Sequence, residues 1–348
     1  MIYFFPKYGE LGASSRLRSY QFIRGHFDSL LRSGQLLVSP LIDDSLLASF
    51  YSTGHYSWPR LLSAYLRRIW FLLQLRSCDH IYIEKELFPM LPFWFEFLFL
   101  RNVKYCLDFD DAIFHNYDLS ANRFKRLLLS KKLSSLAKYS AVSRCGNFYL
   151  LEYCRSAGCR DVRFFPTVVR LDKYDKQRHH DSCGLPSLVW IGSPSTKRYL
   201  MPVLGYLLSL SDLFSLTIIG LTPFETSHEN IVFHPWSSHT EVSLLASCDV
   251  GIMPLEDGPW ERGKCAYKLI QYMACGLPVI ASPVGFNCHV VKHGKNGFFA
   301  STGSEWIRAA ASLINDLDLR RSLGGNGRRF VEQYFSSESV VDSFLCLD

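Results

Sequence analysis

The chain has 348 residues, of which 48% are hydrophobic and 20% charged, and its formal net charge is +6. This length fits two domains of roughly 150–170 residues, and the composition excludes a mainly disordered chain. No run of five or more basic residues occurs, so we expect no nucleic-acid partner, whereas a mildly basic surface suits anionic partners such as nucleotide diphosphates.

The first half alternates short apolar segments with longer segments of helical spacing. Such alternation predicts a parallel sheet covered by helices on both faces. We expect strands at residues 2–5, 36–39, 80–83, 103–107 and 139–142, and helices at 15–31, 59–75, 93–100, 123–136 and 147–157.

A polar stretch over 172–187 is interpreted as a surface linker, and its His179-His180 pair has nothing nearby to complete a metal site. The second half then repeats the alternation of the first. We expect strands at 188–191, 215–219, 231–234, 250–254 and 278–281, and helices at 199–208, 240–246, 267–274, 305–317 and 318–334. The sequence therefore predicts a doubly wound domain over 1–170, a linker over 171–187, a second such domain over 188–330, and a tail over 331–348 that could return to the first domain.

The eleven cysteines are irregularly spaced and form no CxxC pair, so we expect reduced thiols in a cytoplasmic protein. The apolar N-terminus is too short for a signal peptide and is predicted as a strand. The longest apolar stretch, over 87–100, is shorter than the roughly 20 residues that span a membrane. Its Phe and Trp residues fit either a buried helix or a helix at the membrane surface.

The densest chemical signal follows the strand predicted at 250–254. A loop rich in Gly and charge covers 255–265 and leads into a helix that begins near Ala266. The first backbone N–H groups of a helix are unpaired and attract phosphate. Arg262 and Lys264, just before the helix, could neutralise a diphosphate. The residues alone thus predict an anion site at this loop.

The segment MACGLPVIAS at 273–282, followed by Gly285 and by Asn296-Gly297, resembles the donor-binding region of family 4 (group 1) glycosyltransferases. WIGSPST at 190–196 is similar to the first loop of the family's C-terminal domain. GASSR at 12–16, DFDDAIF at 108–114 and PTVV at 166–169 resemble N-terminal segments of its cell-surface-polysaccharide members. The resemblance implies the GT-B fold, an α/β architecture in which two Rossmann-like domains face each other across a cleft. The acceptor domain would cover 1–170 and the nucleotide-sugar domain 188–330.

The resemblance also implies a reaction. A sugar would pass, with retained configuration, from a UDP- or GDP-linked donor to a glycan or lipid-linked acceptor in lipopolysaccharide or other surface-polysaccharide biosynthesis. No metal or other cofactor is expected, although Asp108-Phe109-Asp110 has the form of a metal-binding motif. The protein would be cytoplasmic and could contact the inner face of the membrane peripherally.

Candidate residues for this chemistry lie in both halves. Asp110, Asp111 and His115 follow a strand and could orient or deprotonate an acceptor hydroxyl, although an Asp there could equally cap a helix. The remaining catalytic candidates are Lys197, which could neutralise the leaving diphosphate or be a solvated surface charge, and Glu261. The donor-binding candidates are Gly12, Arg16, Gly192, Ser193, Thr196, Arg198, Arg262, Lys264, Cys265, Ala266, Tyr267, Lys268 and Gln271.

The sequence departs from the family pattern at two positions. Many members carry two glutamates eight residues apart, and the corresponding positions here are Gly263 and Gln271. Gln271 can still bond ribose hydroxyls, and Glu261 or Glu256 could supply the missing carboxylate. Two alternatives stay open: a catalytically impaired scaffold that binds nucleotide at most, and a nucleotide-sugar epimerase or hydrolase on the same fold.

Overall fold

The computed structural model describes residues 1–174, 184–224 and 228–346. The chain divides into two compact units. The first unit consists of residues 1–167 with 263–265 and 340–348, and the second consists of residues 168–262 with 266–339. The His179-His180 pair and most of the predicted linker lie outside the described residues.

In its described part, the first unit has a six-stranded parallel sheet of order β2-β1-β3-β4-β5-β6. Strand β4 is buried along its whole length, as expected for a parallel strand with helices on both faces. The strands are β1 (Ile2–Phe5), β2 (Leu36–Val38), β3 (His80–Glu84), β4 (Tyr105–Phe109), β5 (Val142–Cys145) and β6 (Val162–Phe164).

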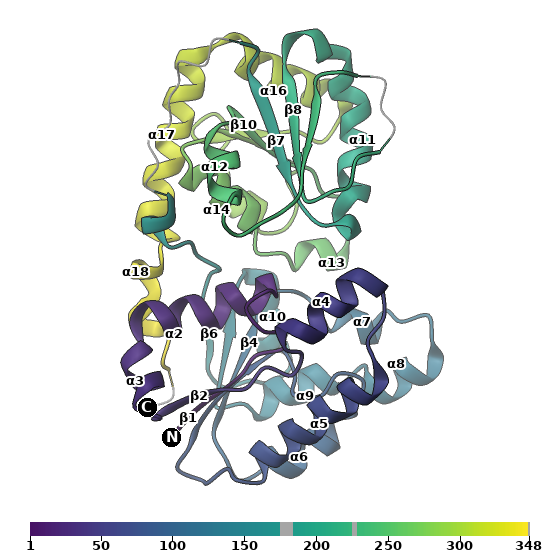
Figure 1. Ribbon diagram of the computed structural model, residues 1–348, viewed down its shortest axis with the longest axis vertical. Coiled ribbons are helices and arrows are strands. Elements are labelled where there is room, and N and C mark those ends of the chain that lie inside the picture. Colours follow the sequence, from purple (N-terminus) through teal and green to yellow (C-terminus); the bar gives the residue numbers. More distant parts are fainter. Residues whose placement is uncertain (175–183, 225–227, 347–348) are drawn as a thin grey trace. The chain divides into compact units, whose positions relative to one another are not determined.

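Helices cover both faces of this sheet, with α2 and α3 on one face and α5, α6 and α9 on the other (Figure 1). The two sides follow from the strand order, because crossovers between parallel strands are right-handed and the one from β1 to β2 runs opposite to the later ones. The helices are α1 (Ala13–Ser15), the π-helix η1 (Arg16–Tyr20), α2 (Gln21–His26), α3 (Asp28–Arg32), α4 (Asp44–Thr53), α5 (Trp58–Leu72), α6 (Phe93–Leu100), α7 (His115–Asp118), α8 (Arg123–Leu129), α9 (Lys132–Tyr139) and α10 (Phe148–Ser156).

The second unit, where described, has another six-stranded parallel sheet, of order β12-β11-β10-β7-β8-β9. Helices α11 and α16 cover one face, and α12, α14 and α17 cover the other (Figure 1). The strands are β7 (Ser187–Ile191), β8 (Ser215–Ile219), β9 (Ile231–His234), β10 (Val250–Met253), β11 (Val279–Ala281) and β12 (Gly297–Phe299). The helices are η2 (Leu171–Tyr174), η3 (Pro194–Thr196), α11 (Lys197–Leu207), η4 (Leu208–Leu213), α12 (Glu241–Ala246), α13 (Pro259–Arg262), α14 (Tyr267–Ala274), α15 (Asn287–Val290), α16 (Gly303–Asn315) and α17 (Leu317–Tyr334), and the chain ends through α18 (Ser337–Val340) and η5 (Val341–Ser343).

Several predicted elements are observed with the expected bounds, among them α6, α14, β8 and β9. The helix expected over 15–31 begins at Ala13 and is interrupted at Phe27, whose φ of −123° leaves the helical region. The helix expected over 123–136 is two helices, because the chain turns at Lys131 (φ −94°, ψ 2°). The strand expected at 139–142 begins only at Val142, since Tyr139 ends α9.

Helix α4 was not predicted, although the sequence carries its end signals. The side chain of Asp43 accepts a hydrogen bond from the Leu46 amide at the start of the helix, and Gly54 ends it with a φ of 78°. The cysteines of the described residues are all free thiols, and most of them are buried, as the irregular spacing predicted.

Candidate functional site

Polar side chains from the carboxyl ends of β3 and β4 meet in the first unit. Lys85, directly after β3, places its Nζ 2.8 Å from Asp110 Oδ1, directly after β4. The Lys85 ammonium also donates to Ser14 Oγ at 2.8 Å. The Ser14 hydroxyl in turn lies 2.8 Å from Glu84 Oε1 and contacts Asp110. The carboxyl ends of parallel strands are where ligands bind in such sheets.

These groups strongly perturb one another's ionisation. Burial by itself would raise the pKa of Asp110, but Lys85 and then Arg18 outweigh it, so the pKa of this carboxyl is lowered. Burial raises the pKa of Glu84 in spite of the opposing charge of Lys85. Burial would lower the pKa of Lys85, but Asp110 and Glu84 raise it above its ordinary value. Lys85 is therefore a permanent cation between two buried carboxyls.

Asp110 is thus not a helix cap, which the sequence had left as an alternative. The helix that follows, α7, begins after Phe114 without a side-chain cap. Asp111 is partly buried, and its pKa is raised by burial and then by Asp110, against the lowering effect of Lys264. Two adjacent carboxyls whose pKa values shift in opposite directions are typical of acid–base sites.

In the Asp108-Phe109-Asp110 motif, Asp108 has a different role from Asp110. Asp108 Oδ1 accepts from Arg18 Nη2 at 2.7 Å and from Arg144 Nε at 3.0 Å, and all three side chains are buried. Two guanidinium groups therefore neutralise the Asp108 carboxylate in the core of the first unit. Among the described residues no group of three or more His, Cys, Asp and Glu side chains is placed to hold a metal ion.

The loop 263–265 packs in the first unit against the residues that follow β4 and β5. Asn147 Nδ2 donates to Gly263 O at 2.7 Å, and Cys265 Sγ donates to Asp110 O at 2.8 Å. A Cβ at position 263 would lie 2.3 Å from the Cβ of Ala112. A glutamate cannot occupy position 263 in this arrangement, which is a physical reason for the departure from the family pattern.

The other candidates of the first unit lie around this cluster. His115 is bonded through Nδ1 to Asp118 at 2.9 Å and through Nε2 to Tyr149 Oη at 2.8 Å. It therefore belongs to a hydrogen-bonded group different from that of Asp110. Arg16 donates to the carbonyl of Glu10 at 3.1 Å and so closes the loop after β1. Gly12 lies in that loop, where a Cβ would be 2.3 Å from the Tyr8 Cβ.

In the second unit, the loop after β7 is closely packed. A Cβ on Gly192 would lie 2.4 Å from the Trp190 ring and 2.6 Å from Thr196 Oγ1. The Ser193 amide donates to Thr196 Oγ1 at 3.1 Å, which fixes the turn into α11. Gly220, after β8 with a φ of 92°, approaches the Gly192 carbonyl. Gly220 is required because its backbone approaches that of Gly192, and Gly192 is required because a side chain there would meet Trp190 and Thr196.

A buried carboxylate lies beside the start of α11. Glu261, in α13, is 7% exposed, and its Oε1 accepts from Arg198 Nη2 at 3.0 Å and from the Tyr199 hydroxyl. Burial and the hydrogen bond to Glu261 raise the pKa of Tyr199 to about 12. Glu261 is therefore held in one orientation by a cation and a neutral hydroxyl.

Two of the remaining candidate cations, Lys197 and Lys268, lie at the starts of α11 and α14. Lys197 Nζ lies 4.0 Å from the Phe224 ring centroid, and Lys268 Nζ lies 4.5 Å from that of Trp190. Such contacts with ring faces hold the ammonium groups without neutralising them. Arg262 forms an exposed ion pair with Asp257 at 2.7 Å.

Helix α14 begins in an unusual way and carries Gln271 on its buried side. Ala266 precedes it with a left-handed φ of 53°, and Tyr267 is its first residue. Gln271 is 3% exposed and donates from Nε2 to Tyr174 Oη at 3.1 Å. Its amide nitrogen is therefore engaged inside the second unit.

A pocket of about 530 Å³ lies in the second unit, against α11 and the segments that follow β10 and β11. Tyr199, Glu256 and Ser282 are among its lining residues. Tyr199 thus connects this pocket to Glu261.

Comparison with known proteins identifies this second unit. Residues 187–316 match the family model described as glycosyl transferases group 1. These residues run from β7 through α16 and contain the Gly192 loop, Glu261 and the start of α14. Over residues 187–316 the second unit is similar to the glycosyl transferases of group 1, and we call this part of the chain the group 1 domain.

Curated relatives match short segments of the chain. The N-acetyl-alpha-D-glucosaminyl L-malate synthase of Bacillus anthracis is 35% identical over 86 residues, which cover 24% of this chain and 23% of that protein. The capsular polysaccharide biosynthesis glycosyltransferase CapM of Staphylococcus aureus is 37% identical over 87 residues, 22% of each chain. The matches thus span about a quarter of the length of these relatives.

Solved structures match over almost the whole chain. HepE of Anabaena, in complex with UDP-glucose, superposes with a TM-score of 0.73 at 15% identity, over 99% of this chain and 97% of that one. Sucrose-phosphate synthase of Thermosynechococcus elongatus gives a TM-score of 0.67 at 14% identity, over 98% and 96%. The chain has the GT-B fold, so the predicted fold class and family resemblance are both confirmed.

The sequence analysis did not identify several residues around the candidate sites of the two units. Four residues were not singled out: Glu84, which ends β3, Lys85, which follows it, Tyr199 in the first turn of α11, and Asn147, which caps α10. A lone Lys or Tyr after a strand is too common to be a signal by itself. Their importance arises from partners that lie far away in the sequence.

Proposed function

We propose that this chain transfers a sugar from a nucleotide-sugar donor to an acceptor hydroxyl, with retained configuration. The observation that carries the proposal is the group 1 match over 187–316, which covers the closely packed Gly192 loop and the buried Glu261. HepE was solved with UDP and with UDP-glucose, which supports a nucleotide-sugar as the donor.

The second unit offers the charges that a diphosphate needs. Lys197 and Lys268 are held over aromatic rings, and Arg198 lies in the first turn of α11. Cations and helix N-termini stabilise a leaving diphosphate as its charge develops. These groups would bind and orient the donor, so the proposal requires no resident metal or other cofactor.

Glu261 is the best candidate for the carboxylate that the family places at position 263. Position 263 has no room for a side chain beside Ala112, whereas Glu261 is fixed by Arg198 and Tyr199. We infer that Glu261 accepts hydrogen bonds from donor hydroxyls. Gln271, whose amide nitrogen is engaged by Tyr174, would contribute less to ribose binding than the family's glutamate.

The first unit would bind the acceptor at the carboxyl ends of β3 and β4. Glu84 Oε2 is buried and has no hydrogen-bond partner among the described residues, and a buried carboxylate oxygen of this kind suits a hydroxyl donor. Asp110 and Asp111 would then orient the attacking hydroxyl. The similarity to CapM supports an acceptor in surface-polysaccharide assembly, on the cytoplasmic side of the membrane.

The test combines donor binding with turnover. UDP- and GDP-sugars should raise the melting temperature selectively for one base, and sugar should then pass to an acceptor glycan. Glu261→Gln should lower kcat/KM at least about tenfold, while Glu229→Gln, at an exposed position of the second unit, should leave it nearly unchanged.

Other outcomes would contradict the proposal. If no nucleotide shifted the melting temperature at millimolar concentration, the chain would be a scaffold. This is the hypothesis that the differences from the family pattern at Gly263 and Gln271 favour. Donor turnover that proceeded equally well without any acceptor would identify a hydrolase or epimerase.

A further inference from the structure

Helix α5 in the first unit has apolar side chains on two opposite faces. One face packs inward through Ala64 and Leu72. On the opposite face Trp58, Leu62 and Trp70, which are spaced by multiples of four residues, are 81%, 61% and 60% exposed. Side chains four residues apart align along one side of a helix. This stripe is far more apolar than the isolated exposed residues of an ordinary surface.

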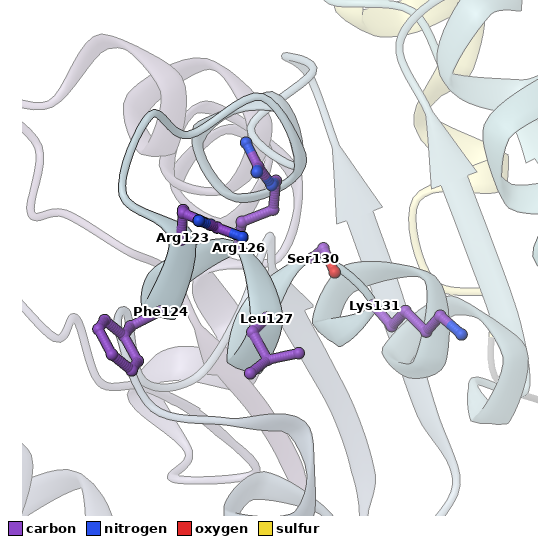
Figure 2. A pocket seen from close by; sticks show the side chains of 6 residues that line it. All are labelled: Arg123, Phe124, Arg126, Leu127, Ser130 and Lys131. Carbon is purple, nitrogen blue, oxygen red and sulfur yellow. The ribbon is translucent and has the colours of Figure 1, made fainter.

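A second helix on the same side of the unit has the same character. In α8, Phe124 is 79% and Leu127 78% exposed. Figure 2 shows both side chains projecting from one side of α8, next to Arg123 and Arg126, which extend from the other. A hollow of about 810 Å³ beside them is lined by these residues together with Ser130 and Lys131.

Figure 1 places both helices on the sheet face that also carries α6 and α9. Helix α6 adds Trp94 and Leu98, four residues apart and more than half exposed. The aromatic segment that the sequence suggested for a membrane surface is only partly available, because some of its Phe residues pack inward, for example Phe95 and Phe99 against the buried Phe88. We call the exposed apolar residues of α5 and α8 (Trp58, Leu62, Leu66, Trp70, Phe124 and Leu127) the α5–α8 surface.

The charge of this region is mainly positive. Residues 45–78 and 119–151 contain no Asp or Glu, while Arg60, Arg123, Arg126 and Lys131 are exposed. Arg67 is also exposed but is paired with Asp43 at 3.5 Å. The nearby Glu96 of α6 is buried and paired with Lys132 at 2.8 Å. A second copy of the chain would bring equal charges together, which disfavours a dimer through this surface. A bilayer of anionic lipids provides both apolar depth and opposite charge.

We propose that the α5–α8 surface binds peripherally to an anionic lipid bilayer. Trp58, Trp70 and Phe124 enter the interface, where aromatic side chains are favoured, and the surrounding Arg and Lys contact lipid phosphates. None of the described helices is long and apolar enough to cross a bilayer. The inference goes beyond the proposed transfer reaction and does not depend on it.

The experiment is co-flotation of the full chain with vesicles. Vesicles of equal parts phosphatidylcholine and phosphatidylglycerol should bind the protein, and vesicles of phosphatidylcholine alone should bind it at least about tenfold more weakly. Salt at 1 M should reduce binding to the anionic vesicles, because it screens charges beyond about 3 Å.

Paired variants test the residues themselves. Trp58→Ser with Trp70→Ser, or Phe124→Ser with Leu127→Ser, should weaken vesicle binding at least about tenfold. Val232→Ser with Tyr334→Ser, which changes exposed apolar residues of the second unit, should not weaken it.

A second set of variants tests the charges. Arg60→Gln, Arg123→Gln and Lys131→Gln together should weaken binding by about tenfold to a hundredfold. The control with equal charge change is Lys292→Gln, Lys295→Gln and Arg308→Gln, at exposed positions of the second unit. All these positions are on the surface, and far-ultraviolet circular dichroism with thermal unfolding checks that each variant is folded.

Three results would overturn the proposal. The first is wild-type protein that does not float with anionic vesicles, and the second is equal binding by the test and control variants. The third is a dimer of the wild-type protein, seen by light scattering in the absence of lipid, that is lost in the variant with Trp58→Ser and Trp70→Ser. Failure of nucleotide binding, in contrast, would overturn the proposed transfer reaction and leave the vesicle result unaffected.

Discussion

At the scale of single residues, the candidate acceptor site depends on Lys85. This lysine has a left-handed φ of 68°, which is unfavourable for a side chain of its type. Its amide donates to Asp108 O at 2.9 Å, and its ammonium pairs with Asp110. The strained backbone thus places one cation between two carboxyls that come from neighbouring strands.

Replacing this cation should be costly. Lys85→Met should reduce the free energy of unfolding by about 3–5 kcal/mol at pH 7, because Asp110 and Glu84 lose their buried partner. Lys85→Arg, which keeps the charge, should cost less. Urea unfolding of the three proteins at pH 7 measures both differences.

The pH dependence has a definite sign. The lowered pKa of Asp110 contributes stability that is present above its unfolded pKa of about 3.9 and is lost as pH falls through the lower folded value. The raised pKa of Lys85 contributes stability below about pH 10.4 that is lost only at higher pH. In Lys85→Met, Asp110 and Glu84 lose the charge that lowers their pKa values, so burial raises both pKa values and the carboxyls take up protons as the pH falls from 7 towards 4. The cost of Lys85→Met should therefore shrink over this range, and a cost independent of pH would show that the ion pair is not its source.

At the scale of elements, the loop 263–265 is positioned by packing and not by its own sequence propensity. Gly263 lies against Ala112, and its carbonyl accepts from Asn147. The same three residues lie between α13 and α14, the helices of the group 1 domain that carry Glu261 and Lys268. A change at Gly263 should therefore affect both stability and the geometry of the donor loop.

A pair of glycine variants tests this. Gly263→Ala should destabilise the protein by about 1–3 kcal/mol, because the new methyl group has no space, and it should also reduce transferase activity. Gly205→Ala, in the exposed interior of α11 with no atom within 4 Å of the added Cβ, should stabilise it by about 0.5–1 kcal/mol. Thermal unfolding of both variants decides the point, and equal effects would contradict the packing argument.

At the scale of the whole molecule, the C-terminal segment completes the core of the first unit. Phe344 is fully buried and stacks on Phe22 at 4.6 Å and on Phe4 at 5.3 Å between ring centroids. Its carbonyl accepts from Arg144 Nη1 at 2.6 Å. The core of the first unit is therefore incomplete without Phe344.

Truncating this side chain should destabilise the first unit specifically. Phe344→Ala should cost about 3–5 kcal/mol, and Phe344→Leu clearly less, because the cavity is smaller. Chemical unfolding measures the cost. Nucleotide binding by the group 1 domain serves as the control, and it should persist under conditions in which the protein is still folded.

Much of the fold could be predicted from the sequence, because its signals are local. The apolar runs of β8 and β9 and the helical spacing of α6 and α14 are encoded within each segment, and Gly276, with a φ of 74°, follows the end of α14. The resemblance of MACGLPVIAS and WIGSPST to group 1 glycosyltransferases was also readable, since these motifs are continuous in the chain. The helix breaks at Phe27 and Lys131 could not be predicted from the sequence, because they depend on how each helix packs.

The candidate sites were decided by the tertiary structure. The pairing of Lys85 with Asp110, the contact of Gly263 with Ala112 and the hydrogen bond from Tyr199 to Glu261 each join residues far apart in the sequence. The sequence by itself determined most of the strands, although not β6 and β12, and it marked the glycine loops that follow them. Only the folded chain decided which cation faces which carboxylate. The ends of parallel strands are brought together by long crossovers, and the residues that meet there carry no local pattern that identifies their partners.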